Sequence, residues 1–183
     1  RKIDKYFAEW KKDADRKPII VKGPRQVGKT ESIKHFAKIN YESVIYINFV
    51  EEVKYKVIIS DGYKVDDIIK NISLIDPSKK FIENKTLIFF DELQDFPEIA
   101  TALKFFCIDK RYDVICSGSM LGINYNRIES NSVGYKCDYN MYSMDFEEFL
   151  WAKGYEENQI DNILEHMKTR KPFSDTELSI YNS

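Results

Sequence analysis

A run of eight residues near the N-terminus carries the clearest chemical signal in this 183-residue chain. Gly23 to Thr30 (GPRQVGKT) fits the pattern GxxxxGK[ST] of a phosphate-binding loop, and we call it the phosphate loop. Its glycines let several backbone N–H groups turn toward one phosphate chain, and the following helix start adds partial positive charge. Lys29 is then placed to reach the β- and γ-phosphates, and the Thr30 hydroxyl to ligate Mg²⁺.

The whole phosphate loop is therefore expected to bind a nucleoside triphosphate. The residues assigned to ATP binding are Gly23, Pro24, Arg25, Gln26, Val27, Gly28, Lys29 and Thr30. Within this set the Arg25 side chain is expected to point away from the phosphates. A turn of chance composition is the alternative explanation, but the predicted strand before the loop and the predicted helix after it favour phosphate binding.

An apolar run that ends in two acids supplies the second candidate. Thr86 to Glu92 (TLIFFDE) predicts a strand buried on both faces, which can present acids only at its carboxyl end. Ligands bind at that end of a parallel sheet. Asp91 is then placed to hold Mg²⁺, and Glu92 to act as the general base on the attacking water. Two solvated acids are the alternative, because strand-end acids are common.

A hydroxyl at another strand end is the third candidate. Ser117-Gly118-Ser119 closes the apolar run Val114 to Cys116, which we expect to lie beside the Asp91 strand. Ser117, favoured over Ser119, could hydrogen-bond the γ-phosphate or the attacking water. A serine at a strand end is also an ordinary turn residue.

Short apolar runs alternate with helical patterns and must position these residues. Strands are predicted at 18–22, 43–49, 86–90, 113–116 and 136–142, and helices at 29–39, 65–74, 99–108, 145–153 and 157–168. An N-terminal helix is expected as well, with Tyr6, Phe7 and Trp10 on a stripe that is more often core than a contact to a base. This order predicts an α/β three-layer sandwich with a mostly parallel central sheet, followed by C-terminal helices.

Composition excludes several classes of protein. The 28 basic and 30 acidic residues nearly cancel, so bulk charge demands neither a nucleic acid nor an anionic membrane. Cys107, Cys116 and Cys137 show no metal-binding spacing and indicate reduced thiols in a cytoplasmic protein. Two histidines, His35 and His166, make a zinc site improbable. No apolar stretch approaches the length of a membrane span, so no membrane partner is expected.

The choice of nucleotide follows from what accompanies the loop. A GTPase would carry the motif NKxD, which reads guanine. The near match in this chain is Asn84 to Leu87 (NKTL), which lacks the aspartate. No arginine-rich lid of the kind that small-molecule kinases carry is visible. The acid pair at Asp91 and Glu92 therefore favours an enzyme that hydrolyses ATP with Mg²⁺.

Four blocks in this order resemble the prokaryotic ATPases of the AAA superfamily: GPRQVGKT at 23–30, LIFFDELQ at 87–94, SGSML at 117–121 and MDFEEFL at 144–150. The resemblance implies a parallel sheet with the phosphate-loop strand central and the Asp91 and Ser117 strands near it. It assigns Lys29 and Thr30 to the Walker A motif, Asp91 and Glu92 to the Walker B motif, and Ser117 to the sensor position. Many relatives carry Gly-Arg where this chain has Gly134-Tyr135-Lys136.

The resemblance also shapes the expected domain organisation. Residues 1–168 are expected to form the P-loop ATPase domain, N-terminal helix included, and residues 169–183 a linker toward a C-terminal domain outside this chain. The chain begins at Arg1 directly before a helical pattern, and a capping box at Ser174 to Glu177 should begin another helix close to Ser183. We therefore expect a piece of a longer protein, with that C-terminal domain as partner.

Other roles stay open at this point. The chain could instead be a regulatory or scaffold module that binds ATP with little turnover, or an ATPase that handles nucleic acid, and a homo-oligomer is possible. No arginine can be assigned to the transition state: Arg127 is most simply a solvated loop residue, and Arg111 caps a helix end.

Overall fold

The computed structural model describes residues 1–119 and 133–181 and divides the chain into two compact units. One unit comprises Lys2–Ser143, and the other Met144–Ser183 together with Arg1. Arg127 and the last two residues of the SGSML block, 120–121, lie outside the described residues. None of the described helices is long and apolar enough to cross a bilayer.

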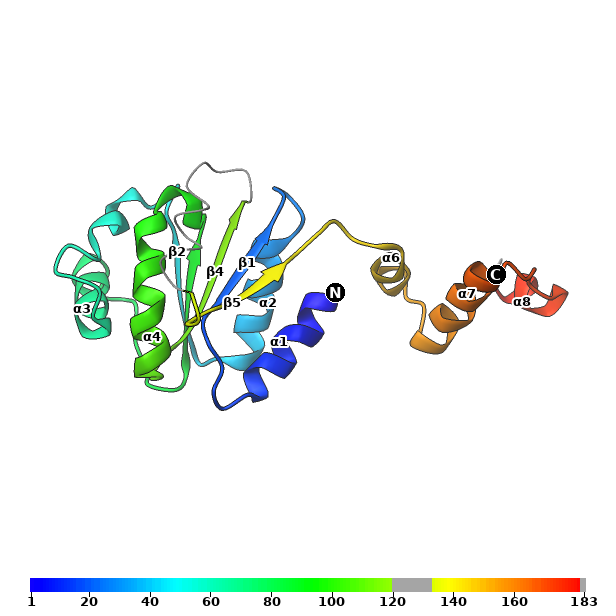
Figure 1. Cartoon of the computed structure of the whole chain (residues 1–183), viewed down its shortest axis with the longest axis horizontal. Coiled ribbons are helices and arrows are strands. Elements are labelled where there is room, and N and C mark those ends of the chain that lie inside the picture. The colour runs from blue at the N-terminus through cyan, green and yellow to red at the C-terminus, as the bar shows by residue number, and fades with distance from the viewer. Residues whose placement is uncertain (120–132, 182–183) are drawn as a thin grey trace. The chain divides into compact units, whose positions relative to one another are not determined.

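The unit Lys2–Ser143 is built on one parallel sheet (Figure 1). Its strands are β1 (Ile19–Gly23), β2 (Ser43–Asn48), β3 (Thr86–Asp91), β4 (Asp113–Ser119) and β5 (Cys137–Asn140). They lie in the order β2-β3-β4-β1-β5, and every pairing between these strands is parallel. The predicted α/β architecture is confirmed. The middle strand is β4, with β1 on one side of it and β3 on the other.

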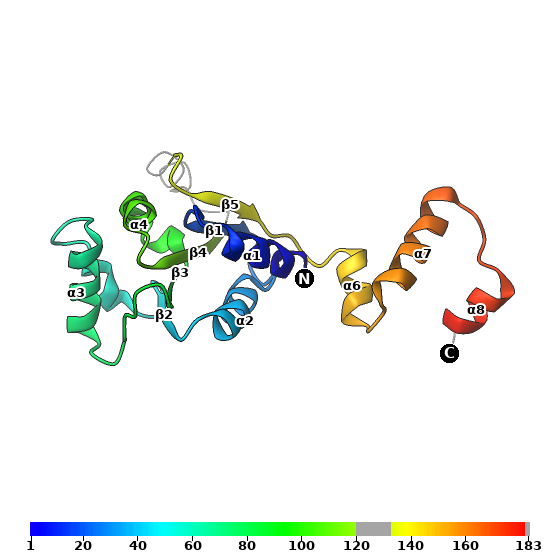
Figure 2. The ribbon, with the colours of Figure 1, turned by 90° about the horizontal axis from the view of Figure 1, so that it is seen from below.

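Helices cover both faces of this sheet (Figure 2). Among the described residues of this unit, the α-helices are α1 (Lys2–Lys12), α2 (Lys29–Asn40), α3 (Val65–Ile75) and α4 (Leu103–Asp109), and the 3₁₀-helices are η1 (Val53–Val57), η2 (Leu93–Asp95) and η3 (Pro97–Ala102). Helices α1 and α2 pack on one face, whereas α3 and α4 pack on the other. The result is the expected three-layer sandwich.

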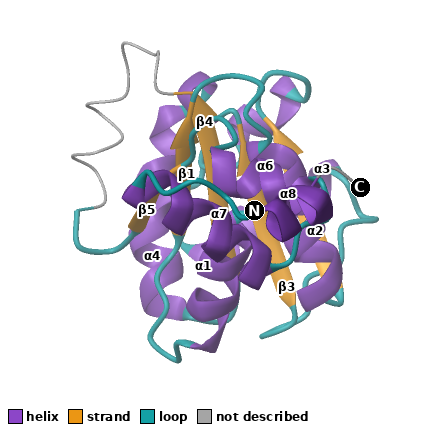
Figure 3. Ribbon diagram, turned by 90° about the vertical axis from the view of Figure 1, so that its right-hand side faces the viewer, coloured by secondary structure: helices purple, strands orange, loops and turns teal. Residues whose placement is uncertain are grey.

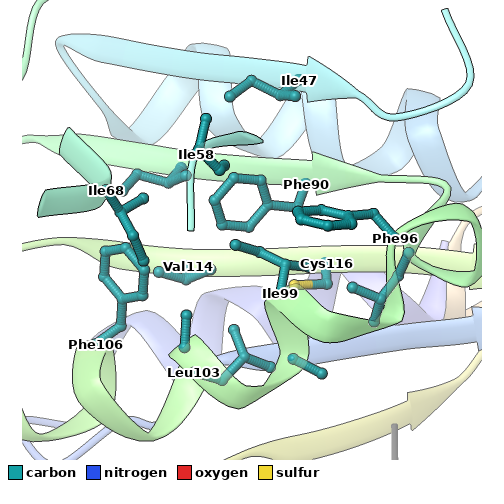
Figure 4. Close-up of a cluster of buried hydrophobic side chains, with 14 of the residues drawn as sticks. Ile47, Ile58, Ile68, Phe90, Phe96, Ile99, Leu103, Phe106, Val114 and Cys116 are labelled. Atoms are coloured by element: carbon teal, nitrogen blue, oxygen red, sulfur yellow. The ribbon is translucent and has the colours of Figure 1, made fainter. Parts of the chain in front are cut away.

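Alternation along each strand explains why the core has two halves. In β3, Ile88 and Phe90 face α3 and α4, while Leu87 and Phe89 face α1 and α2. Figure 4 shows Phe90 of β3 and Cys116 of β4 among side chains of the half of the core that α3 and α4 cover. Successive side chains of a strand point to opposite faces, so a strand buried on both faces is apolar throughout, as the sequence of β3 is.

One helix differs from its prediction. The expected helix at 99–108 begins as the 3₁₀-helix η3 at Pro97, and regular α-helix starts only at Leu103. Proline fixes the backbone angle φ at the first helical position, and tight 3₁₀ turns are common at helix starts. The helical stretch is therefore longer than predicted at its N-terminal end and wound more tightly there.

The second unit contains α6 (Phe146–Ala152), α7 (Glu157–Thr169) and α8 (Asp175–Tyr181), coloured as helices in Figure 3. The predicted capping box forms at the start of α8: the Glu177 N–H donates to Ser174 Oγ at 3.3 Å, and the Ser174 N–H donates to Glu177 Oε2 at 2.8 Å. The domain boundary expected at residue 168 stays a prediction.

Candidate active site

The phosphate loop joins the end of β1 to the start of α2, as its sequence predicted. Gly23 is packed so closely against the residue that follows β5 that a Cβ atom there would lie 2.0 Å from the Met141 carbonyl oxygen. Gly28 has φ of 94°, and Gln26 has φ of 64° although it carries a side chain. A non-glycine residue in this left-handed region is strained by roughly 1–2 kcal/mol, and such strain is concentrated at ligand sites.

Lys29 begins α2 and folds back over the loop. Its ammonium donates hydrogen bonds to the carbonyl oxygens of Gly23 at 3.0 Å and Pro24 at 2.7 Å. Burial lowers the pKa of Lys29, and the negative charges of Glu92 and Asp91 partly oppose that shift. The lysine is thus held inside the loop, beside the acids of β3.

Asp91 is the centre of the hydrogen-bond network at the ends of the strands. It is 3% exposed. Its Oδ2 accepts from the Thr30 hydroxyl at 2.9 Å and from the Tyr46 hydroxyl at 3.1 Å. Its Oδ1 accepts from the Ser117 hydroxyl and from the backbone N–H of Glu92, the latter at 3.0 Å. These four donors satisfy a carboxylate that would otherwise be costly to bury.

Strand register brings these groups together. Phe90 of β3 is aligned with Cys116 of β4, so the next residues, Asp91 and Ser117, reach the same level of the sheet. By alternation both side chains point to the face that α2 covers, where Thr30 begins the helix. Lys29, Thr30, Asp91 and Ser117, singled out from sequence, therefore converge at one edge of the sheet.

Tyr46 belongs to this network but was not singled out from sequence. It lies on β2, on the α2 side of the sheet, and burial raises its pKa to about 12, with the Asp91 charge acting in the same direction. Asn48 donates to the Tyr46 hydroxyl at 3.4 Å. The available signal was the alternation within SVIYINF, which puts Tyr46 on the α2 side of a strand beside β3 once the strand order is known.

Glu92 begins the turn that follows β3. Its backbone has φ of 58° and ψ of 48°, a second strained residue in the site. The Gln94 side-chain amide donates a hydrogen bond to Glu92 Oε2. Left-handed backbone at Glu92 ends β3 and turns the chain directly into η2.

A cavity of about 420 Å³ lies over the loop and the acid turn. It is lined by Arg25, Gln26, Gly28, Lys29, Thr30, Glu31, Glu92 and Ser119. Ser117 is fully buried beneath it, bonded to Asp91, so of the two serines it is Ser119 that reaches the cavity. The Tyr6, Phe7 and Trp10 stripe packs elsewhere, with Phe7 and Trp10 against Phe36 of α2 and Tyr6 against Tyr139 of β5.

The hydroxyl of Thr30 and the carboxylate of Asp91 suit Mg²⁺. Thr30 Oγ1 and Asp91 Oδ2 are 2.9 Å apart. Adjacent ligands of an octahedral Mg²⁺ at about 2.1 Å are separated by about 3 Å, and this ion prefers a few hard protein oxygens together with phosphate and water. A hydroxyl and a carboxylate at this spacing fit it.

The family of the chain follows from comparison with known proteins. Residues 15–150 match the family model described as AAA domain. The chain belongs to the AAA domain family. This match spans β1 to β5 and so includes the phosphate loop, Asp91, Glu92 and Ser117.

The fold of this AAA domain is similar to that of a solved structure. A structure of Drosophila ORC bound to DNA aligns with a TM-score of 0.52 at 15% identity, over 91% of this chain and 48% of that chain. A structure of C. elegans PCH-2 aligns with a TM-score of 0.45 at 13% identity, over 96% of this chain and 49% of that chain. This chain therefore spans about half the length of each of the two matched chains. A search of curated proteins gave no match.

Proposed function

We propose that this AAA domain binds ATP with Mg²⁺ and hydrolyses it to ADP and phosphate. We also propose that this hydrolysis acts on a C-terminal effector domain that lies outside this chain. The observation that carries the proposal is that Lys29, Thr30 and Glu92 line one cavity, with Asp91 hydrogen-bonded to Thr30. Membership of the AAA domain family supports nucleotide binding. Hydrolysis, Mg²⁺ and the effector domain go beyond what family membership alone supports.

The phosphate loop would hold the triphosphate through its backbone N–H groups and the start of α2. Lys29, whose ammonium now donates to Gly23 and Pro24, would exchange these carbonyl partners for phosphate oxygens. A charged phosphate is a stronger acceptor than a neutral carbonyl, so this exchange favours binding.

Thr30 and Asp91 would hold Mg²⁺, with Tyr46 and Ser117 fixing the orientation of the Asp91 carboxylate. When bound, the ion neutralises charge on the β- and γ-phosphates. Partners that orient a metal-binding carboxylate are part of the site, because they limit the positions it can adopt.

Glu92 would act as the general base. One of its oxygens accepts a proton from water, the water oxygen bonds to the γ-phosphorus, and the bond from that phosphorus to the β,γ-bridging oxygen breaks, leaving ADP and phosphate. Glu92 lines the cavity beside the loop, whereas Asp91 does not line it and would hold Mg²⁺ together with Thr30. This division leaves Glu92 as the carboxylate for the water.

The test is ATP binding by calorimetry together with phosphate release, for the wild-type chain and Lys29→Ala. We expect the substitution to weaken ATP binding at least about 100-fold, since a charge-assisted contact to phosphate is lost. Lys38→Ala, in the exposed last turn of α2, is the matched control and should bind as the wild type does. If Lys29→Ala bound ATP with the affinity of the wild type, the phosphate loop would not be the ATP-binding site. Tight binding without phosphate release would indicate a regulatory or scaffold module instead.

A further inference from the structure

The side-chain amide of Gln94 connects Glu92 to the end of β4. Its Nε2 donates to Glu92 Oε2, and its Oε1 accepts from the backbone N–H of Ser119 at 3.0 Å. The same Nε2 also donates to Asp95 Oδ2 at 2.9 Å. One amide thus joins the turn after β3 to a residue that lines the cavity.

The chemistry of the partners allows only one orientation of this amide. The carboxylates of Glu92 and Asp95 can only accept hydrogen bonds when ionised, and a backbone N–H can only donate. A rotated amide would place its oxygen against carboxylate oxygens and its NH₂ group against the Ser119 N–H. Both ends of Gln94 are therefore matched to their neighbours in the observed orientation and mismatched in the other.

Gly118 provides the space for this arrangement. A Cβ atom at Gly118 would lie 3.0 Å from Gln94 Oε1 and 3.5 Å from Leu93 Cβ. An added methyl group would therefore press on the amide oxygen and shift it relative to the Ser119 N–H. The absence of a side chain at Gly118 thus leaves room for the amide at the end of β4.

The strained backbone at Glu92 is what brings Gln94 to β4. With φ of 58° the chain reverses after β3, and η2 follows over Leu93–Asp95. Leu93 is buried in the core, which anchors the turn. Gln94 then points back to the strand end, where its carbonyl oxygen meets Ser119.

We propose that Gln94 is a positioning residue that holds the Glu92 carboxylate for its reaction with water. This inference rests on the proposed function of Glu92 as the general base. With Oε2 held by the amide, Oε1 is the oxygen that takes the proton. Because the amide is also bonded to Ser119, the end of β4 and the general base move together.

Gln94→Glu is the sharpest variant, because it is nearly isosteric. It keeps an oxygen acceptor for Ser119 but loses the donor to Glu92 and sets a second carboxylate against it. We expect its single-turnover hydrolysis to be about 10- to 100-fold slower than that of the wild type, since a small misplacement of a reacting group has an effect of this size. Its Kd for ATP should stay within about twofold, because Gln94 is absent from the cavity lining.

Asp95→Asn is the matched control. It removes the other carboxylate partner of Gln94 but keeps an oxygen acceptor at the same place, so the rate should stay close to that of the wild type. Gly118→Ala should reproduce the Gln94→Glu effect with all polar groups intact. Wild-type hydrolysis rates in both Gln94→Glu and Gly118→Ala would overturn the proposal.

A second measurement does not depend on hydrolysis. In the nucleotide-free chain, the ¹H–¹⁵N resonances of the Gln94 side chain, identified by their absence in Gln94→Glu, should shift in Glu92→Ala and in Gly118→Ala. Unchanged resonances in both variants would show that Gln94 does not hold the Glu92 carboxylate, whatever the rates of ATP hydrolysis. If the wild-type chain binds ATP without hydrolysing it, the proposed function of Glu92 fails, and these resonances alone decide whether Gln94 holds its carboxylate.

Discussion

The Thr30 hydroxyl lies 2.9 Å from Asp91 Oδ2 and donates a hydrogen bond to it. These residues are 61 positions apart in sequence, one at the start of α2 and the other at the end of β3. The contact joins the two halves of the candidate site, the loop that would hold phosphate and the acids that would act on its metal and water.

Asp91→Asn should remove the Mg²⁺ dependence of ATP binding. An amide oxygen is a weaker ligand for a hard divalent cation than a carboxylate. The Kd for ATP measured with Mg²⁺ and with a chelator should differ at least about tenfold in the wild type and by less than about twofold in Asp91→Asn. A variant that kept the wild-type ratio would show that Asp91 does not hold the metal.

Tyr46→Phe should destabilise the fold, because it removes one of the donors to the buried Asp91 carboxylate. Loss of a hydrogen bond to a charged group lowers the free energy of unfolding by roughly 1.5–3 kcal/mol. Urea denaturation measures this change. Tyr63→Phe, in which the substituted ring can still stack on Phe105, is the control and should change the value by less than about 0.5 kcal/mol. Equal effects of the two substitutions would argue against the role of Tyr46.

Gly23→Ala should impair ATP binding by moving the loop. The added methyl group would meet the Met141 carbonyl oxygen of the backbone, which cannot move aside as a side chain can. Gly62→Ala is the control, because Gly62 has φ of 114° but open space around its Cβ position. The control should lose about 1 kcal/mol of stability and keep its affinity for ATP. Unimpaired binding by Gly23→Ala would show that the close approach to Met141 does not shape the loop.

The opposite end of the sheet carries a carboxylate whose ionisation stabilises the fold. Asp113 accepts hydrogen bonds from Arg16 at 2.7 Å, Lys11 at 2.8 Å and Tyr41 at 2.7 Å. Burial by itself would raise the pKa of Asp113, but these three donors outweigh it and hold the pKa below the ordinary value of 3.8. The network ties α1, the segment after it and α2 to the start of β4.

Because the pKa of Asp113 is lower in the folded state than in the unfolded state, its contribution is present above about pH 4 and is lost as pH falls through the folded-state pKa. Asp113→Asn should lower the free energy of unfolding by roughly 2 kcal/mol at pH 7, and this deficit should shrink below about pH 4. Denaturant unfolding of both proteins from pH 7 to pH 3 measures the difference. A deficit that does not change with pH would contradict this account of Asp113.

Much of this arrangement could be predicted from sequence, for reasons that particular residues make clear. The apolar runs around Ile20, Ile88 and Ile115 predicted buried parallel strands, and the structure confirms them. The pattern Gly-Lys-Thr after the first strand and the acids after the third marked the groups that now converge. Their roles in binding and catalysis stay predictions.

What could not be predicted depends on register and on backbone turns. Tyr46 meets Asp91 only because β2 lies beside β3 in a particular register, which no local pattern encodes. Gln94 reaches Ser119 only because Glu92 adopts a left-handed backbone, and glutamate has no special preference for it. Ser117 was expected to face the nucleotide or the water, but the register that aligns it with Asp91 also buries it.

In the proposed mechanism Glu92 takes a proton from the attacking water, and single-turnover hydrolysis of ATP by Glu92→Gln measures the contribution of this carboxylate. We predict that this variant binds ATP with the affinity of the wild type and releases phosphate at least about 100-fold more slowly, the loss expected when a general base is removed. Glu83 is an exposed acid that precedes the start of β3, and the control variant Glu83→Gln should hydrolyse ATP at the wild-type rate. Wild-type phosphate release by Glu92→Gln would show that Glu92 is not the general base.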